Sequence, residues 1–136
     1  KVPQVQIVPL KEYFNTMRKL GLKLAIMTND CYEVAITQLN KAQVFDKLDC
    51  VIGFDSGYGK KPDPDPLLAI AKMLHLEPGQ MVMVGDSLHD VVAGRAAGMK
   101  TIALLTGLAT REELSSFADV VLQDISEIPN YLNLDQ

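Results

Sequence analysis

The sequence is poor in the residues that build metal clusters and disulfide frameworks. Its 136 residues include no tryptophan, two cysteines and two histidines. The cysteines, Cys31 and Cys50, do not form a Cys-x-x-Cys pair, which argues against a zinc site. Two isolated cysteines fit a reducing compartment, so we expect a cytoplasmic protein. No apolar run approaches the roughly 20 residues of a membrane-spanning helix, so we expect no membrane partner.

Positive charge is also scarce. The chain has 13 lysines and arginines against 17 aspartates and glutamates, which gives a formal net charge of −4. This balance argues against a nucleic-acid partner, and an anionic ligand would need a few placed cations or a metal ion. The length fits a single domain over residues 1–136, long enough to bury roughly two-thirds of its unfolded surface.

Continuous apolar segments alternate with segments of helical periodicity. The apolar segments predict strands at residues 22–27, 50–53, 81–84, 101–104 and 119–122. This alternation predicts an α/β fold: a Rossmann-like, doubly wound parallel sheet in three α/β/α layers. Ligands of such sheets bind at the carboxyl ends of the strands, so chemistry is expected in the residues that follow each strand.

Several residues mark the expected helix ends. Asp30 and Asp65 are expected N-caps, and Thr110 begins a capping box. Gly98 is expected in the position just beyond a helix, where a left-handed residue is common. The last helix is expected to be interrupted, or to end, near Pro129.

Thr28, Asn29 and Asp30 follow the first predicted strand. A hydroxyl, an amide and a helix N-terminus meet there, which suits an anion such as phosphate. Simple capping of the next helix explains the same three residues, and this segment alone leaves both interpretations open.

The loop after the second predicted strand carries two lysines. Lys61 precedes Pro62, which favours an extended backbone, and a lysine on such a stiffened loop could present a fixed charge to a phosphoryl oxygen. A solvated pair with Lys60 is the simpler interpretation of this segment alone. Asp63 and Asp65 form an Asp-x-Asp pattern, but they follow no strand and both precede prolines. We therefore interpret them as turn or cap residues.

Two carboxylates follow the third predicted strand. Gly85 and Asp86 end that strand, and Asp90 lies one helical turn further on, so both carboxylates can face one point. Oxygen ligands of this kind suit Mg²⁺. Ordinary helix capping is the alternative, and it explains Asp90 better than it explains Gly85 and Asp86 at a strand tip. His89, between them, is expected at the surface.

Three segments together resemble the second, third and fourth motifs of the haloacid dehalogenase superfamily, especially its phosphatases of the phosphoglycolate-phosphatase type. They are residues 24–29, 59–64 and 83–90, in that order, each at an expected strand end or on the loop that follows. The resemblance extends over nearly the whole chain from about Ile7.

The resemblance implies a role for each matching residue. Thr28 would hydrogen-bond the transferring phosphoryl group with help from Asn29, and Lys61 would offset charge on that group and on the nucleophile. Asp86 would bind Mg²⁺, and Asp90 would complete the cluster directly or by holding Lys61. The implied activity is that of a Mg²⁺-dependent phosphatase-type hydrolase acting on a small phosphorylated metabolite.

The family's first motif, a strand ending in Asp-x-Asp that supplies the nucleophile, has no counterpart in this sequence. The chain begins with Lys1 rather than methionine, and we expect both this strand and the family's cap domain upstream. In the family that strand lies between those ending here at Thr28 and Asp86. We therefore expect five parallel strands with a gap, completed by the missing N-terminal segment or by another chain. Residues 5–8 alternate enough for a strand, but flanking prolines and the lack of an acid argue against their filling the gap.

Two other doubly wound domains match the sequence less well than a phosphatase does. A phosphate-sensing receiver domain has its acids first and its lysine last, whereas the order here is Thr28, Lys61, Asp86. A dinucleotide-binding domain would carry Gly-x-Gly-x-x-Gly after its first strand, and residues 28–31 do not match it. The remaining alternative is a truncated, non-catalytic domain that binds phosphate or Mg²⁺ or contacts a partner protein.

Overall fold

The computed structural model describes residues 10–134, and its helices and strands alternate as the sequence predicts. None of the helices in this part of the chain reaches the length and hydropathy that crossing a bilayer would require. The elements are α1 (Leu10–Lys19), β1 (Ala25–Met27), α2 (Tyr32–Lys41), β2 (Cys50–Ile52), α3 (Asp65–Met73), β3 (Val82–Gly85), α4 (Leu88–Ala96), β4 (Lys100–Leu104), α5 (Arg111–Ser115), β5 (Val120–Leu122) and α6 (Ile128–Tyr131). Short 3₁₀ helices lie at Phe45–Lys47, Phe54–Ser56, Pro78–Gln80 and Ile125–Glu127.

The strands of the described region form two parallel sheets. β1 pairs with β2, with Ala25 opposite Cys50, and β4 lies between β3 and β5. Within residues 10–134, β1 and β3 do not pair, so the sheet is interrupted where the sequence predicts a gap. That another strand completes the sheet there stays a prediction, and residues 5–8 lie outside the described residues.

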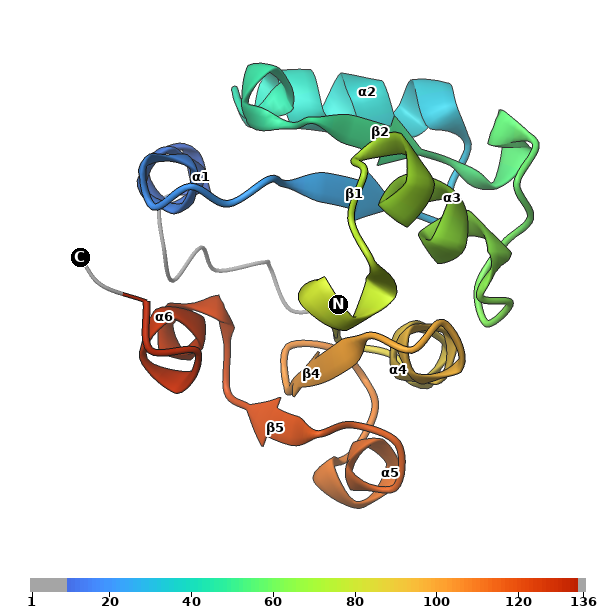
Figure 1. The fold of residues 1–136 in the computed structure, drawn as a ribbon, viewed down its shortest axis with the longest axis vertical. Coiled ribbons are helices and arrows are strands. Elements are labelled where there is room, and N and C mark those ends of the chain that lie inside the picture. Colours follow the sequence, from blue (N-terminus) through green and yellow to red (C-terminus); the bar gives the residue numbers. More distant parts are fainter. Residues whose placement is uncertain (1–9, 135–136) are drawn as a thin grey trace.

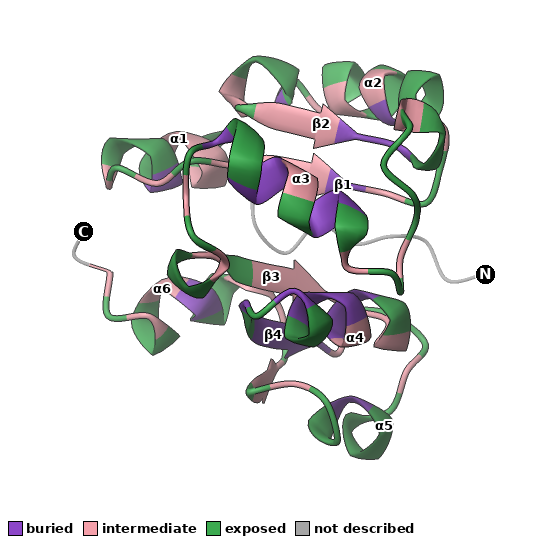
Figure 2. Cartoon of the chain, turned by 45° about the vertical axis from the view of Figure 1, so that its right-hand side comes forward, coloured by how far each residue is buried: buried purple, intermediate pink, exposed green. Residues whose placement is uncertain are grey.

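Helices cover both faces of the strands (Figure 1). α1 and α6 lie on one side, and α3 and α4 lie on the other. Figure 2 shows β4 and much of α4 as buried. One core packs α3 and α4 against the strands and includes Met27, Ile52, Ile70, Ala93 and Met99. The opposite core includes Met17, Ile102, Leu104 and Ile128. The predicted α/β class, with parallel strands between two helical layers, is confirmed.

Most predicted helix ends are close to the observed ones. Gly98 has a φ of 83° just beyond α4, and the Thr110 hydroxyl caps α5, as predicted. The N-cap of α3 is Pro64, so the prediction for Asp65 is wrong by one residue. Pro129 lies in the first turn of α6 rather than ending a helix. A proline is tolerated there because the first-turn N–H groups have no partner within the helix.

The start of α2 differs from the prediction because its cap comes from a distant loop. Cys31, not Asp30, is the N-cap residue, and its side chain makes no capping bond. Instead the carboxylate of Asp55 accepts a hydrogen bond from the N–H of Tyr32 at 2.8 Å. A contact over 23 residues leaves no local signal in the sequence.

Gly94 lies on the buried face of α4, and we predict that alanine at this position destabilises the protein. A Cβ there would lie 2.7 Å from the Cβ of Met83 and 2.8 Å from the Cγ2 of Thr101. Alanine favours a helix by about 1 kcal/mol over glycine, but overpacking costs about 1–3 kcal/mol. Gly94→Ala should therefore lower the free energy of unfolding, measured by urea denaturation.

Gly79 provides the matched control, because a Cβ at this position would meet no atom within 4 Å. Gly79→Ala should change the free energy of unfolding by no more than about 0.5 kcal/mol. Equal stability of the two variants would contradict the close packing of α4 on β3 and β4.

Candidate active site

Thr28 directly follows β1 and is partly buried. Its N–H donates to the Ile52 carbonyl at 3.0 Å, which extends the pairing with β2 by one bond. Its Oγ1 accepts a hydrogen bond from the Asp30 N–H at 3.0 Å, so the hydroxyl stabilises the turn that leaves the strand. The hydroxyl hydrogen is a separate donor, and within residues 10–134 it has no acceptor, so it could be donated to a phosphoryl oxygen.

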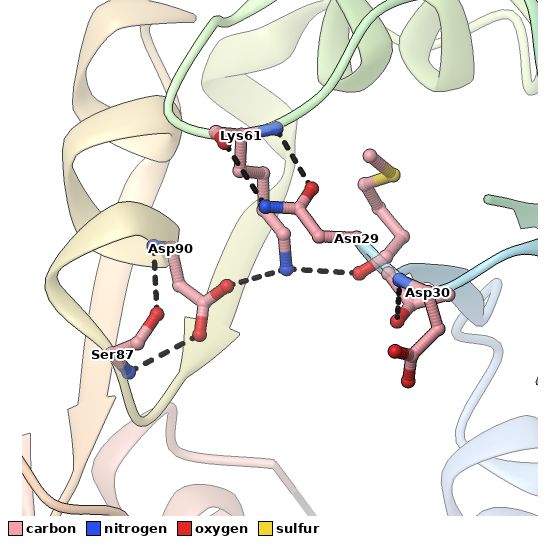
Figure 3. A network of polar contacts seen from close by, with 7 residues as sticks. Asn29, Asp30, Lys61, Ser87 and Asp90 are labelled. Atoms are coloured by element: carbon pink, nitrogen blue, oxygen red, sulfur yellow. Dashed lines mark hydrogen bonds and ion pairs between the residues drawn. The ribbon is translucent and has the colours of Figure 1, made fainter. Parts of the chain in front are cut away.

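Lys61 reaches from the loop before α3 to the interruption between the two sheets (Figure 3). Its Nζ donates to the Met27 carbonyl at 3.0 Å and to Oδ1 of Asp90 at 2.5 Å. The side chains of Lys61 and Asp90 are 10% and 11% exposed. The contact therefore joins the end of β1 to the first turn of α4 through an ion pair that water barely reaches.

Asp90 is held by the local geometry of the turn before α4. Its Oδ2 accepts from the Ser87 N–H at 3.2 Å, and its own N–H donates to the Ser87 hydroxyl at 3.3 Å, which is a reciprocal capping box. Gly85 makes room for this carboxylate, because a Cβ there would lie 2.3 Å from Oδ2 of Asp90. The spacing from Gly85 to Asp90 thus orients one carboxylate toward Lys61.

Asp86 lies at the tip of β3 and faces a different neighbour. Its Oδ2 accepts from the Thr106 hydroxyl at 3.3 Å. A Cβ on Gly107 would lie 2.7 Å from the Asp86 carbonyl oxygen and 2.8 Å from its Cγ, so this position requires glycine. Thr106 and Gly107 were not among the predicted site residues. They follow β4 at the same edge of the sheet, so the rule that placed Thr28 and Asp86 could have found them.

Asn29 makes a contact that the sequence analysis did not predict. Its Oδ1 accepts from the Lys61 N–H at 3.0 Å, and its Nδ2 donates to the Lys61 carbonyl, also at 3.0 Å (Figure 3). Its expected role as a phosphate ligand stays a prediction.

A groove of about 470 Å³ opens beside Lys61, lined by Asn29, Phe54, Lys60, Lys61, Pro62 and His89. His89 is exposed, as predicted. Asp63 is also exposed, and its N–H donates to the Lys60 carbonyl at 3.0 Å. This hydrogen bond agrees with the interpretation of Asp63 as a turn residue.

The two carboxylates of the fourth motif differ in their capacity to bind a metal ion. Both oxygens of Asp90 have protein partners. Oδ1 of Asp86 accepts no hydrogen bond from the described residues, and these residues hold no group of three or more His, Cys, Asp or Glu that could bind a metal. Mg²⁺ usually keeps several waters and binds through one or two carboxylates and a substrate phosphate. Asp86 therefore fits such an ion better than Asp90 does.

Comparison with known proteins identifies the family of proteins that shares this fold and the polar residues at this edge of the sheet. The sequence model of the haloacid dehalogenase-like hydrolases matches residues 5–104, which is most of the chain. The chain belongs to this family, and the resemblance inferred from the three motifs is confirmed.

Two curated relatives are phosphoglycolate phosphatases. The one from Psychrobacter arcticus is 34% identical over 117 residues, covering 85% of this chain and 51% of the relative. The one from Escherichia coli K12 is 36% identical over 115 residues, covering 84% of this chain and 46% of the relative. The chain thus spans about half the length of these relatives.

A solved structure shares the fold closely. The HAD family hydrolase from Deinococcus radiodurans R1, with bound phosphate and sodium, superposes with a TM-score of 0.83 at 27% identity. The match covers 93% of this chain and 58% of that one.

Because the pair between Lys61 and Asp90 is buried, we predict that removing one partner is costly. Asp90→Ala leaves a desolvated ammonium with one carbonyl partner, and the free energy of unfolding should fall by about 3–5 kcal/mol. The ion pair between Lys47 and Asp46 is the control. Its Nζ and Oδ2 atoms are 3.4 Å apart, and the Asp46 side chain is 75% exposed. Asp46→Ala should cost at most about 1 kcal/mol. Urea denaturation compares the two, and a similar small loss in both would show that burial does not strengthen the first pair.

Proposed function

We propose that the protein is a Mg²⁺-dependent phosphatase-type hydrolase of small phosphate esters, to which this chain contributes the phosphate- and metal-binding residues. The observation that carries the proposal is the Lys61 ammonium, fixed between the Met27 carbonyl and the Asp90 carboxylate. Thr28 and Asp86 follow the strands on either side of it. The curated relatives, both phosphoglycolate phosphatases, and the phosphate bound in the Deinococcus structure support a phosphoryl substrate.

Charge explains how these side chains would act on a phosphoryl group. A transferring phosphoryl group carries negative charge on its oxygens, and stabilising that charge is most of the catalysis. Thr28 would donate its hydroxyl hydrogen to one such oxygen. Two of the three Lys61 ammonium hydrogens are directed to Met27 and Asp90, and the third, which has no acceptor among the described residues, would be donated to the substrate.

The same charges favour a metal ion at Asp86. Lys60 is exposed to solvent, whereas the partly or fully buried charges at this edge are one positive, Lys61, and two negative, Asp86 and Asp90. A phosphate dianion would therefore be repelled without another cation. Mg²⁺ ligated by Asp86 would supply that charge when bound. Asp90 would act by holding Lys61, the second of the two roles that the family resemblance offers for it.

In this proposal the attacking carboxylate comes from the family's first motif, on a strand between β1 and β3. The Asp-x-Asp of this sequence, Asp63 and Asp65, lies on a loop and at the start of α3 rather than at a strand end. The upstream segment or another chain would supply the nucleophile and complete the sheet. The alternative is a truncated, non-catalytic domain that binds phosphate or Mg²⁺ or contacts a partner protein.

A turnover assay on residues 1–136 alone tests whether this part of the protein catalyses hydrolysis or only binds its ligands. We predict no release of phosphate from phosphate esters, because Thr28, Lys61 and Asp86 stabilise charge but no carboxylate is placed to attack. Mg²⁺-dependent release of phosphate would contradict the prediction that residues 1–136 lack a nucleophile. If that release persisted in Asp86→Ala, it would also contradict the proposed role of Asp86.

In a form of the protein that also carries the first motif, the strand-end residues should dominate activity. Asp86→Asn should remove most activity and shift the Mg²⁺ dependence, and Lys61→Ala should lower the rate by about 10²–10³, the effect of removing one preorganised donor. Asp63→Ala is the matched control and should have little effect. Steady-state phosphate release measures all three, and a larger loss for Asp63 than for Asp86 would show that the loop has been misassigned.

A further inference from the structure

The loop that carries Lys61 is not held by packing. Residues 57–60, 62 and 63 are exposed, and Lys61 is less exposed than its neighbours on either side. Gly57 and Gly59 have φ values of 97° and 96°, a conformation that glycine adopts without strain. A loop of this kind needs anchors if Lys61 is to stay in one place.

Asn29 provides such an anchor, because it engages the backbone of Lys61 at both polar groups. One side-chain amide accepts from the Lys61 N–H and donates to the Lys61 carbonyl, each at 3.0 Å. A primary amide is suited to this task, since it presents one acceptor and two donors side by side. An aspartate would retain the acceptor and lose the donor, and an alanine would lose both.

The contact fixes one end of Lys61 while other groups fix the opposite end. Asn29 holds the main chain, and the Met27 carbonyl and Asp90 hold the ammonium. Asn29 and Met27 both come from the end of β1. Residues at the end of β1 therefore hold both the main chain and the ammonium group of Lys61.

We propose that Asn29 is a positioning residue, which acts on the reaction by anchoring the backbone of Lys61 and not by contacting the phosphate. This inference rests on the proposed function and replaces the phosphate-binding role expected for Asn29. A displacement of a charged group by about 1 Å can cost up to about 10²-fold in rate, so the anchor matters to catalysis at a distance.

A double-mutant cycle in a form of the protein that also carries the first motif tests the proposal. With Lys61 present, Asn29→Ala should lower kcat/KM for a phosphate ester by about tenfold or more. In a Lys61→Ala background the same substitution should change kcat/KM by less than about twofold, because residues that act through one another are not additive. Equal losses in both backgrounds would overturn the proposal and assign Asn29 a direct contact with the phosphate.

A second measurement does not depend on activity. Hydrogen exchange of the Lys61 amide should be faster in Asn29→Ala than in the unmodified protein, because its acceptor is lost. Asn40→Ala, which removes an exposed asparagine from α2, is the control and should change neither exchange nor kcat/KM. Unchanged exchange at Lys61 in Asn29→Ala would overturn the anchor. If the form that also carries the first motif hydrolyses no phosphate ester, the proposed function fails while the exchange measurement still decides on the anchor.

Discussion

A buried ion pair links two sheets whose described strands do not pair with each other. Lys61 belongs to the β1–β2 half, and Asp90 belongs to the half built from β3, β4 and β5. Their side chains are about nine-tenths buried, so the attraction is weakly screened and a partner lost on either side is not replaced by water. The apolar cores on both faces hold the halves together. The ion pair determines which polar groups meet at the edge where the chain's chemistry is expected.

The residues around the ion pair have the sizes and side chains that hold Lys61 and Asp90 in contact. Gly85 lacks the side chain that would collide with Asp90, and Ser87 closes the capping box that directs the Asp90 carboxylate. Asn29, which follows β1 in the same half as Lys61, fixes the main chain of the lysine. Two segments outside the lysine's own loop therefore hold Lys61 in place: Asn29 binds its main chain, and the segment from Gly85 to Asp90 binds its ammonium group.

The fold and the main strand-end residues were predictable because each has a local signal. Continuous apolar runs predict parallel strands, and the topology then brings Thr28, Lys61, Asp86 and Asp90 to one edge. Long-range contacts have no such signal. The cap that Asp55 provides for α2 spans 23 residues, and the contact of Asn29 with the Lys61 backbone spans 32.

In the fourth motif, residue spacing alone did not decide the side-chain partners, although the family resemblance offered the contact of Asp90 with Lys61 as one of two roles. The spacing of Asp86 and Asp90 suggested one shared metal, whereas Asp86 contacts Thr106 and Asp90 contacts Lys61. Two carboxylates one turn apart can point to one ion or to two neighbours, and only the surrounding loops decide between these outcomes. The lysine comes from the loop before α3, and the hydroxyl comes from Thr106, which follows β4.

The central claim is that Lys61 and a metal at Asp86 together make a phosphate site, and calorimetric titration with inorganic phosphate tests it most directly. In the presence of Mg²⁺ the unmodified protein should bind phosphate, and Lys61→Met should bind it about tenfold or more weakly, as expected when a charge-assisted hydrogen bond is lost. Without Mg²⁺ the unmodified protein should also bind more weakly. Phosphate affinity that is unchanged by Lys61→Met and by removal of Mg²⁺ would contradict the account.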